Sequence, residues 1–410
     1  MLNKNDQREL VYISKVEDIR PIEGKDRVEC AVVGGWTVMV RKGQFKVGDL
    51  GIYFEIDSKV PETEPFEFLA QKHYRIKTQK YGNFYSQGLL MHPNDFGWEV
   101  QIEPLGGVRT EVIIDDEGKP HYEDDESRFL TEKLGVVYSV AEDNERKSKA
   151  VDKYQKMAQR MGKKFSKQPY RWLMRRMWGK KFLYFIYGKT ADTQGFPNWV
   201  TQTDEERVEN MTYIFNNKDP WVATEKIDGT STTFTMKRTG KKKEPYIFIV
   251  CSRNVAFVKL DAQVFSANNV YTEMAEKYNI EAHMKDMLET HPEWKFVTIQ
   301  GETYGHGIQK NTYDIDDHRF MAFNIVTSDK GRWDTLNMAK YLEAYDIPCV
   351  PIVDTTYILP DTIEELRGYV HSKPSVVNGK LREGIVFRQV EQKTGRILSF
   401  KCVDPDYLIK

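Results

Sequence analysis

The sequence predicts an α+β protein in which a small β domain precedes a larger domain of mixed strands and helices. Residues 9–112 contain short runs rich in β-branched and aromatic side chains, separated by glycines or charged turns. From Phe196 onward, stretches with helical periodicity, such as 270–289, alternate with short apolar strands. With 410 residues and 40% hydrophobic content, the chain is long enough for two packed domains. We therefore expect domains at 1–112 and 191–410, joined by a charged, partly helical segment at 113–190.

The first domain is expected to be a small closed barrel. Its runs at 10–13, 29–33, 36–40 and 51–56 have the length and residue types of strands. Gly34-Gly35 lies between two of these runs and is a two-residue hairpin signal. Spacing of this kind favours an OB-like β-barrel, a fold that commonly binds nucleic acid.

The middle segment separates charge by sign. Residues 115–126 hold seven acids against one lysine, whereas residues 146–181 hold fourteen Lys and Arg against the single acid Asp152. A helix is expected from Arg146 to about Lys189, with an apolar stripe at helical spacing. The stripe consists of Trp172, Leu173, Met177, Trp178, Phe182 and Phe185. Two interpretations stay open: a surface that tracks phosphates, or a linker helix packed on one domain by its aromatic side chains.

Cysteine usage and hydropathy bear on the compartment. The four cysteines at positions 30, 251, 349 and 402 include no C-x-x-C pair, which argues against a zinc site or a disulfide framework. The N-terminus has no apolar leader, and no apolar run reaches membrane-spanning length. We expect a soluble cytoplasmic protein with no membrane contact and no obligate protein partner. The net charge of −1 does not by itself indicate or exclude a polyanionic partner.

Six short motifs follow one another in the third segment, each on or just beyond a predicted strand. They are K-I-D-G at 226–229, S-R-N at 252–254, G-E-T-Y-G at 301–305, F-M-A-F-N at 320–324, E-G-I-V-F-R at 383–388 and S-F-K at 399–401. K-x-D-G alone arises by chance in roughly one chain of this length in ten. The ordered set is far more specific than any member of it.

This set resembles the nucleotidyltransferase core shared by ATP-dependent ligases and capping enzymes. Only nine residues follow Lys401, so we expect no OB domain after this core, where capping enzymes and DNA ligases carry one. A preceding β domain, together with the runs 196–199 and 203–210, resembles the ATP-dependent RNA ligases of the Deinococcus type. The resemblance implies an ATP-grasp-like, DNA-ligase-type domain of mixed antiparallel sheets and helices. The charged segment has no counterpart in that pattern and is interpreted as an insertion.

The first motif carries the covalent chemistry that the resemblance implies. An amine such as that of Lys226 can attack the α-phosphorus of ATP, expel pyrophosphate and store AMP as a phosphoramidate. The amine must be unprotonated to attack, which a neighbouring cation favours. Gly229 allows a tight turn after the strand, and Asp228 can orient the lysine or hold metal-bound water. By resemblance, the backbone at Glu225 contacts the adenine edge.

The later motifs supply groups suited to a nucleotide. The guanidinium of Arg253 matches phosphate or ribose oxygens, with a surface ion pair as the alternative. Phe323 holds the position at which the family stacks a ring on the purine, with buried aromatic core as the alternative. Glu302 and Glu383 suit a ribose hydroxyl or a metal ion. Lys401 would neutralise charge on the α-phosphate as pyrophosphate leaves. Many relatives have K-x-K here, whereas this chain has Ser399 in place of the first lysine.

The resemblance implies a reaction in three steps with ATP as the AMP donor and Mg²⁺ or Mn²⁺ as the cation. Asp228, Glu302 and Glu383 are the expected metal-organising acids, acting through water. Lys226 takes AMP, AMP moves to an RNA 5′-phosphate to give an AppRNA end, and a 3′-OH displaces AMP. The expected partner is RNA with 5′-phosphate and 3′-OH ends, at nicks in duplex RNA.

Two alternatives remain at this point. A polynucleotide ligase that also acts on DNA ends would use the same residues, since no residue identifies a reader of the 2′-OH. An inactive nucleic-acid-binding relative would be expected to lack Lys226, Glu302 or Glu383, and all three are present.

Overall fold

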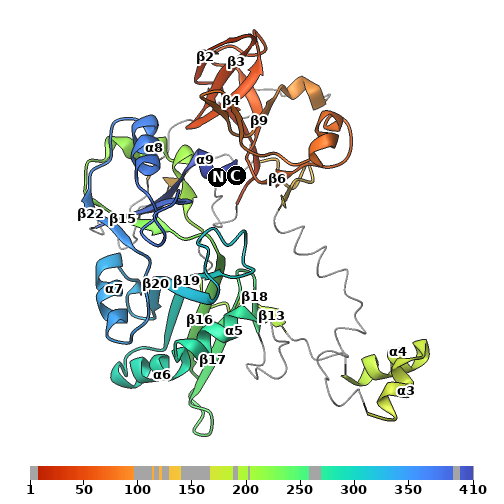
Figure 1. The fold of residues 1–410 in the computed structure, drawn as a ribbon, viewed down its shortest axis with the longest axis vertical. Coiled ribbons are helices and arrows are strands. Elements are labelled where there is room, and N and C mark those ends of the chain that lie inside the picture. The colour runs from red at the N-terminus through yellow and green to blue at the C-terminus, as the bar shows by residue number, and fades with distance from the viewer. Residues whose placement is uncertain are drawn as a thin grey trace. The chain divides into compact units, whose positions relative to one another are not determined.

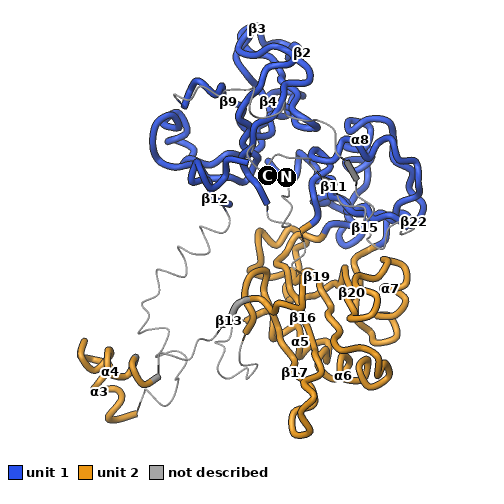
Figure 2. Tube along the Cα trace, turned by 180° about the vertical axis from the view of Figure 1, so that it is seen from behind, with its two compact units in different colours: residues 1–146, 205–226, 352–410 blue, residues 147–204, 227–351 orange. Residues whose placement is uncertain are grey.

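A computed structural model describes residues 8–96, 113–114, 120–121, 129–139, 167–187, 193–201, 204–257, 269–390 and 398–409 (Figure 1). The chain divides into two compact units (Figure 2). Unit 1 comprises residues 1–146, 205–226 and 352–410, and unit 2 comprises residues 147–204 and 227–351. The expected division at 1–112, 113–190 and 191–410 stays a prediction, because this grouping assigns parts of 191–410 to both units.

The N-terminal part of unit 1 is built from short antiparallel strands, as predicted for residues 9–112. One sheet has the order β1 (Val11–Lys15), β5 (Leu50–Phe54), β9 (Leu89–Met91), and another has the order β2 (Asp18–Ile22), β3 (Lys25–Val33), β4 (Trp36–Arg41). The Gly34-Gly35 turn joins β3 to β4 with Val33 opposite Trp36. Within the described residues these strands form separate sheets, not one closed barrel.

Smaller elements complete this part of the chain. They are β6 (Ser58–Lys59), η1 (Glu67–Lys72), β7 (Gln79–Tyr81), β8 (Phe84–Ser86), η2 (Pro93–Phe96), β10 (Ile113–Ile114), β11 (Pro120–His121) and β12 (Val137–Tyr138). Two apolar cores hold the strands together, one around Trp36 and Tyr53 and the other around Phe54 and Phe66. Trp36, Tyr53 and Phe54 are fully buried.

A five-stranded sheet forms the rest of unit 1. Its order is β14 (Glu206–Arg207), β24 (Ser399–Val403), β23 (Gly384–Gln389), β15 (Trp221–Lys226), β22 (Ile352–Tyr357). Alternate residues of β15, β23 and β24, among them Trp221, Phe387 and Phe400, form a core with helix α8 (Ile363–Ser372). Helix α9 (Pro405–Leu408) follows β24, and the turns η5 (Val208–Asn210) and η6 (Thr212–Asn216) precede β15.

Buried polar contacts connect the N-terminal strands to the five-stranded part of unit 1. Asn210 donates to Glu55 at 2.9 Å and accepts from the Trp36 indole at 2.8 Å. Arg367 of α8 pairs with the buried Glu209 at 2.9 Å. The backbone N–H of Gly35 donates to the Glu209 carbonyl at 2.8 Å, and a Cβ at Gly35 would lie 2.6 Å from the Glu209 Cα. The two parts therefore share a closely packed polar interface.

Unit 2 is a seven-stranded sheet with helices on one face. The strand order is β13 (Thr193–Gly195), β18 (Val255–Phe257), β17 (Tyr246–Cys251), β16 (Thr230–Arg238), β19 (Phe296–Gly305), β20 (His318–Thr327), β21 (Gly331–Arg332). Helices α5 (Val270–Lys277), α6 (Ile280–Thr290) and α7 (Thr335–Glu343) pack with these strands around a core that includes Phe234, Trp294 and Phe320. The expected helix at 270–289 is divided in two, because Asn279 adopts a left-handed conformation with φ 48°.

Two short helices, α3 (Tyr170–Met174) and α4 (Met177–Tyr187), occupy the described part of the basic segment. A single helix was expected from 146 to 189; residues 146–166 and 188–189, and most of the acidic run 115–126, lie outside the described residues. The aromatic side chains of this pair are exposed, and both interpretations of the segment stay predictions. Among the described helices, none is long and apolar enough to cross a membrane.

Candidate functional site

Strand register places three cationic side chains on one face of the five-stranded sheet. Lys226 of β15 lies opposite Gly384, Lys401 of β24 lies opposite Val386, and Arg388 of β23 lies opposite Ser399. Directly paired residues, and residues two apart on one strand, share a face. These cations therefore lie on the face opposite the core formed with α8. The site chemistry of unit 1 belongs to this face.

Lys226 forms an ion pair with Glu383. The Nζ atom lies 2.6 Å from the Glu383 Oε1, and the two side chains are 26% and 16% exposed. Lys226 is the last residue of β15, and Glu383 directly precedes β23, so the strand pairing brings the two residues together. A lysine that donates to a carboxylate in this way carries its proton, whereas nucleophilic attack needs the neutral amine. A cation bound at Glu383 would compete with Lys226 for the carboxylate and so favour release of that proton.

In unit 2, the turn at Asp228 and Gly229 is packed tightly against β19. A Cβ at position 229 would lie 2.3 Å from the Thr303 carbonyl oxygen and 2.9 Å from the Glu302 Cγ. Glycine is therefore required for close approach of the backbone, and not for the tight turn that the sequence suggested. This packing brings the turn beside Glu302, which is half-buried on β19 opposite Ser231 and Met321.

A loop after β19 holds the same turn through two hydrogen bonds. The Asp228 N–H donates to the hydroxyl of Tyr313 at 3.0 Å, and the Gln309 side-chain amide donates to the Gly229 carbonyl at 3.0 Å. Tyr313 is only 7% exposed, and its ring packs on Tyr304 with centroids 5.2 Å apart. Gln309 and Asn311 both adopt left-handed backbone conformations. We call residues 306–315 the bracing loop.

The two phenylalanines of β20 have different surroundings. Phe320 is fully buried and belongs to the helix-covered core. Phe323 is half-buried and lies at an irregularity, where Gln300 pairs with Asn324 and Gly301 pairs with Ala322. Phe320 is thus a core residue, whereas Phe323 is not part of that core.

Arg253 follows β17 in an exposed turn. Its guanidinium lies 3.0 Å from Asp204, and the arginine side chain is 50% exposed. This is the ion pair that the sequence left as the alternative interpretation. Exposed pairs contribute about 0–1 kcal/mol, so little free energy opposes exchange of Asp204 for another anion.

Two family models match parts of the chain. Residues 219–403, just under half of the chain, match the family model described as RNA ligase. We call these residues the RNA ligase domain after this match. Residues 10–93 match the PHA02142 OB-fold domain, which confirms the OB-like prediction for the first domain, while the closed barrel is not seen. No match was found among curated proteins.

Several solved structures of the Naegleria gruberi RNA ligase share the fold of nearly the whole chain. A mutant with ATP and Mn has a TM-score of 0.68 at 23% identity, covering 98% of this chain and 99% of that one. The enzyme with PPi has the same TM-score and identity, covering 98% of each chain. A further mutant with AMP and Mn has a TM-score of 0.67 at 23% identity and the same coverage.

Glu225 of the RNA ligase domain points away from the cationic face. It is 1% exposed, and its carboxylate accepts hydrogen bonds from the Ser375 hydroxyl and, at 2.8 Å, from the Val376 N–H. Because alternate residues of a strand face opposite ways, the side chain of Glu225 cannot share the face of Lys226. Its carboxylate anchors the loop before Glu383.

Ser399, which stands in place of the first lysine of the K-x-K pattern, shares an acidic partner with a nearby arginine. The Ser399 hydroxyl donates to Glu205, and Arg388, opposite it on β23, pairs with the same carboxylate at 2.9 Å. The Arg388 side chain is 4% exposed and that of Glu205 is 14% exposed. At the position where the resemblance predicts a lysine, the RNA ligase domain thus has Ser399 on β24, with Arg388 directly opposite on β23.

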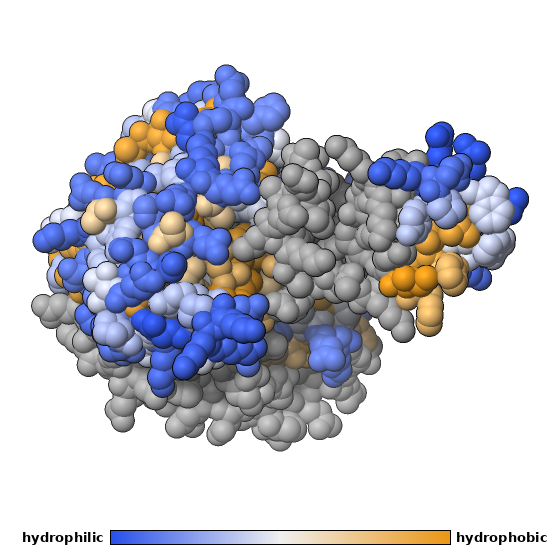
Figure 3. Space-filling model, turned by 90° about the horizontal axis from the view of Figure 1, so that it is seen from below, coloured by the Kyte–Doolittle hydropathy of each residue, from blue (hydrophilic) through white to orange (hydrophobic). Residues whose placement is uncertain are grey.

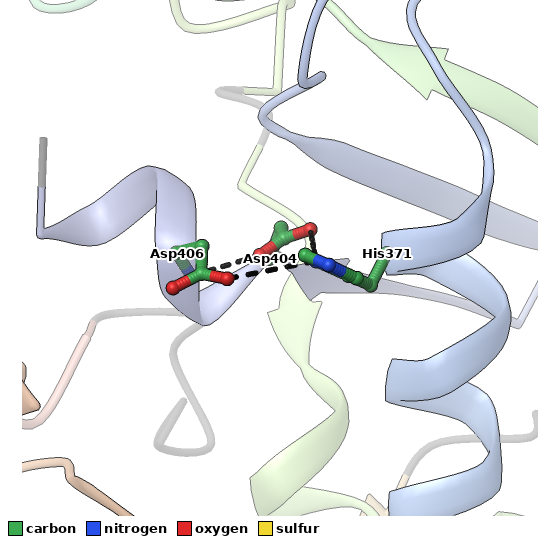
Figure 4. A group of neighbouring side chains, drawn as sticks. All are labelled: His371, Asp404 and Asp406. Atoms are coloured by element: carbon green, nitrogen blue, oxygen red, sulfur yellow. Dashed lines mark hydrogen bonds and ion pairs between the residues drawn. The ribbon is translucent and has the colours of Figure 1, made fainter. Parts of the chain in front are cut away.

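A histidine–aspartate cluster elsewhere in unit 1 has donor atoms of the kind that bind metals. His371 of α8 points toward Asp404 and Asp406 at the start of α9 (Figure 4). Its Nδ1 lies 2.9 Å from Asp404, and Asp406 accepts from Lys80 at 2.7 Å and from the Tyr85 hydroxyl. The hydrogen bond from Lys80 lowers the pKa of Asp406. Because a lysine already neutralises Asp406, the cluster is suited to connecting α8, α9 and β7–β8 and not to holding a cation.

The sequence interpretation missed Tyr313, Ser375 and Glu205, and it placed Gln309 in a loop beside the site without indicating its bond to Gly229. The glycines at 305 and 307 did indicate a shaped loop. No motif, however, indicated which hydroxyl or amide would reach the turn.

Proposed function

We propose that this chain is an ATP-dependent RNA ligase that joins 5′-phosphate and 3′-OH ends through Lys226. The observation that carries the proposal is the Lys226–Glu383 pair at 2.6 Å on the cationic face of an RNA ligase domain. An isolated lysine on a strand end would give no reason to assign a nucleophile. A lysine held by an acid, with Lys401 on the same face, has both a means of controlling its proton and a nearby positive charge.

In the first step, the Lys226 nitrogen forms a bond to the α-phosphorus of ATP. The bond from that phosphorus to the bridging oxygen breaks, pyrophosphate leaves, and the lysine proton passes to solvent. Lys401 is 7% exposed on the same sheet face, where a positive charge stabilises the developing negative charge on the phosphate. The bracing loop fixes the peptide groups directly after the nucleophile and so limits the directions from which the amine can attack.

The residues present fit a divalent cation. Glu302 lies beside the Asp228–Gly229 turn, and Glu383 directly precedes β23 and contacts Lys226. Carboxylate oxygens are the ligands that Mg²⁺ and Mn²⁺ prefer, commonly through water. We assign Asp228, Glu302 and Glu383 to this cation. When bound, it would offset charge on the triphosphate.

The remaining assignments concern the nucleotide. Phe323 offers a ring for the purine, and the peptide groups at Glu225 are assigned to the adenine edge. The exposed Arg253 exchanges Asp204 for a ribose or phosphate oxygen, since the existing pair is weak. The relatives with ATP, AMP and PPi support nucleotide chemistry on this fold.

In the later steps, the lysine-bound AMP passes to an RNA 5′-phosphate, and a 3′-OH then attacks that phosphate and releases AMP. We propose nicked duplex RNA as the substrate, with the OB-fold domain contributing to its binding. A polynucleotide ligase acting also on DNA ends is the second candidate, because the residues above contact phosphate and nucleotide without distinguishing the sugar.

The test is labelling of the purified chain with α-labelled ATP or GTP in the presence of Mg²⁺ or Mn²⁺. We expect an acid-labile label from ATP that is absent in Lys226→Ala and present in Lys237→Ala, a matched lysine change on β16 outside the proposed site. Intact mass would detect protein that is already adenylylated. A label from GTP, or no label on unmodified protein, would contradict the proposal. Sealing of nicked RNA but not of nicked DNA separates the two candidates.

A further inference from the structure

Residues 167–187, which we call the basic hairpin, expose an unusual number of large apolar side chains. Among the described residues of this hairpin, six such side chains are at least 43% exposed: Trp172, Met177, Trp178, Phe182, Phe185 and Ile186. Figure 3 shows apolar and hydrophilic side chains gathered on opposite sides of it, at the right of the view. Clustered exposure of this kind marks an interaction surface.

The two helices of the hairpin approach each other closely. Helix α4 packs on α3 at Gly179, where a Cβ would lie 2.2 Å from the Leu173 carbonyl oxygen. Trp172 of α3 meets Trp178 of α4, yet the two side chains stay 43% and 56% exposed. Both rings therefore keep an exposed part that a ligand can contact.

The charge of the hairpin is of one sign. Residues 167–187 contain six Lys and Arg and no acid. Arg171, Arg175, Arg176 and Lys181 are exposed. The Arg176 guanidinium lies 4.0 Å from the centre of the Trp172 ring, and the Trp172 and Trp178 rings lie 5.8 Å apart at 80°. Cations therefore lie directly beside exposed rings.

We propose that the basic hairpin binds an unpaired strand of the RNA substrate. Proteins that hold single strands combine cations for the phosphates with aromatic rings on which bases stack. Trp172 and Trp178 would supply the rings, and Arg171 and Arg175 would supply the charge. Rings are the larger part of the exposed apolar surface, and bases in a closed duplex have no exposed face for stacking. This inference rests on the proposed function, which makes RNA the polyanion that the chain encounters.

An anionic membrane surface is the other polyanion that a cationic, apolar helix can bind. The observations favour RNA, because the same chain carries an RNA ligase domain and an OB-fold domain. A second copy of the chain is a further possible occupant of the apolar side. Both occupants are outcomes of the experiment below.

The experiment compares two labelled RNAs bound by the full-length chain: a fully paired nicked duplex, and the same duplex with an unpaired extension of about ten nucleotides, within the usual single-strand site size. We expect the extension to tighten binding by the wild type by about tenfold or more, as stacking of one or two bases allows. Trp172→Ala with Trp178→Ala should remove this gain. Trp172→Phe with Trp178→Phe, which keeps the rings, should retain most of it.

A second variant tests the charge without changing the rings. Arg171→Gln with Arg175→Gln should lower the slope of log affinity against log salt by about one to two for the extended RNA, as expected for the loss of two phosphate contacts. Because the apolar contacts of the hairpin are untouched, this result stands even where the double tryptophan variant fails to fold. Circular dichroism checks folding of each variant.

Four outcomes overturn the inference. The first is no gain from the extension in the wild type, and the second is a gain that persists both in Trp172→Ala with Trp178→Ala and in Arg171→Gln with Arg175→Gln. The third is binding to vesicles containing phosphatidylserine that the double alanine variant loses while its RNA affinity is unchanged. The fourth is a wild-type dimer that the double alanine variant converts to a monomer with unchanged RNA affinity. Lysine labelling by ATP is measured in parallel and should be equal in all variants. Failure of labelling in the wild type would refute the proposed function, whereas failure of the extension effect alone refutes the role of the hairpin.

Discussion

Replacement of Tyr313 by phenylalanine tests whether the bracing loop positions the nucleophile. The change removes one hydroxyl and keeps the ring that packs on Tyr304. That hydroxyl accepts the Asp228 N–H at 3.0 Å, two residues from Lys226, and Tyr313 is 7% exposed. Loss of a partner for a sheltered N–H costs about 1–3 kcal/mol. If the bond holds the turn during attack, the rate of lysine adenylylation should fall about 5- to 150-fold.

The assay is single-turnover labelling from ATP over a range of ATP concentrations. We expect the maximal rate to fall while the ATP concentration for half-maximal rate changes little, because the hydroxyl contacts the turn and not the nucleotide. Gln309→Leu, which removes the bond to the Gly229 carbonyl, should act in the same direction, and the double variant should be less than additive. Tyr345→Phe is the matched control, since its hydroxyl bonds to Asp286 between α7 and α6. A rate within twofold of wild type for Tyr313→Phe, or an equal loss in Tyr345→Phe, would refute the reasoning.

Three further changes follow from contacts described above. Gly229→Ala should lower the melting temperature and abolish labelling, because its Cβ would lie 2.3 Å from a backbone oxygen; unchanged melting and labelling would contradict that packing. Arg388→Met should cost about 3–5 kcal/mol of unfolding free energy, measured by urea denaturation, and Glu205→Gln added to it should restore part of the loss. The ion pair with Lys80 lowers the pKa of Asp406. It therefore stabilises the folded protein at pH values above the usual carboxyl pKa, and this stabilisation is lost as the pH falls through the lowered pKa. The stability gap between wild type and Asp406→Asn, about 1 kcal/mol or less, should therefore shrink between pH 5 and pH 3, and a gap that is constant with pH would contradict this.

Contiguous motifs could be predicted from the sequence because their spacing along the chain is also their spacing in space. Lys226 and Asp228 are neighbours on any backbone. Long-range partners could not be predicted in this way. The contact of Tyr313 with Asp228 joins residues 85 positions apart. That contact depends on left-handed residues in the bracing loop. Their conformation cannot be predicted from one sequence.

The same limit explains the other differences. Apolar spacing at 270–289 predicted one helix, and the break at Asn279 depends on one residue that tolerates a left-handed conformation. For the basic hairpin, periodicity could indicate an apolar stripe but not whether another surface covers it. The assignment of the Glu225 backbone to the adenine edge stays a prediction, and the sequence did not indicate that its side chain would bond to Ser375.

The polar interface between the N-terminal strands and the five-stranded part of unit 1 limits how this chain can be divided. Glu209, Asn210 and Glu55 are buried there, and each bonds to a residue of the other part. Cutting the chain between the parts would remove the hydrogen-bond partners of these polar groups and expose to water the surfaces that the interface buries. The OB-fold domain is therefore a poor candidate for deletion or for exchange with that of a distant ligase. An exchanged OB-fold domain would need a glycine at the position of Gly35, and the 207–210 segment would have to be exchanged with it.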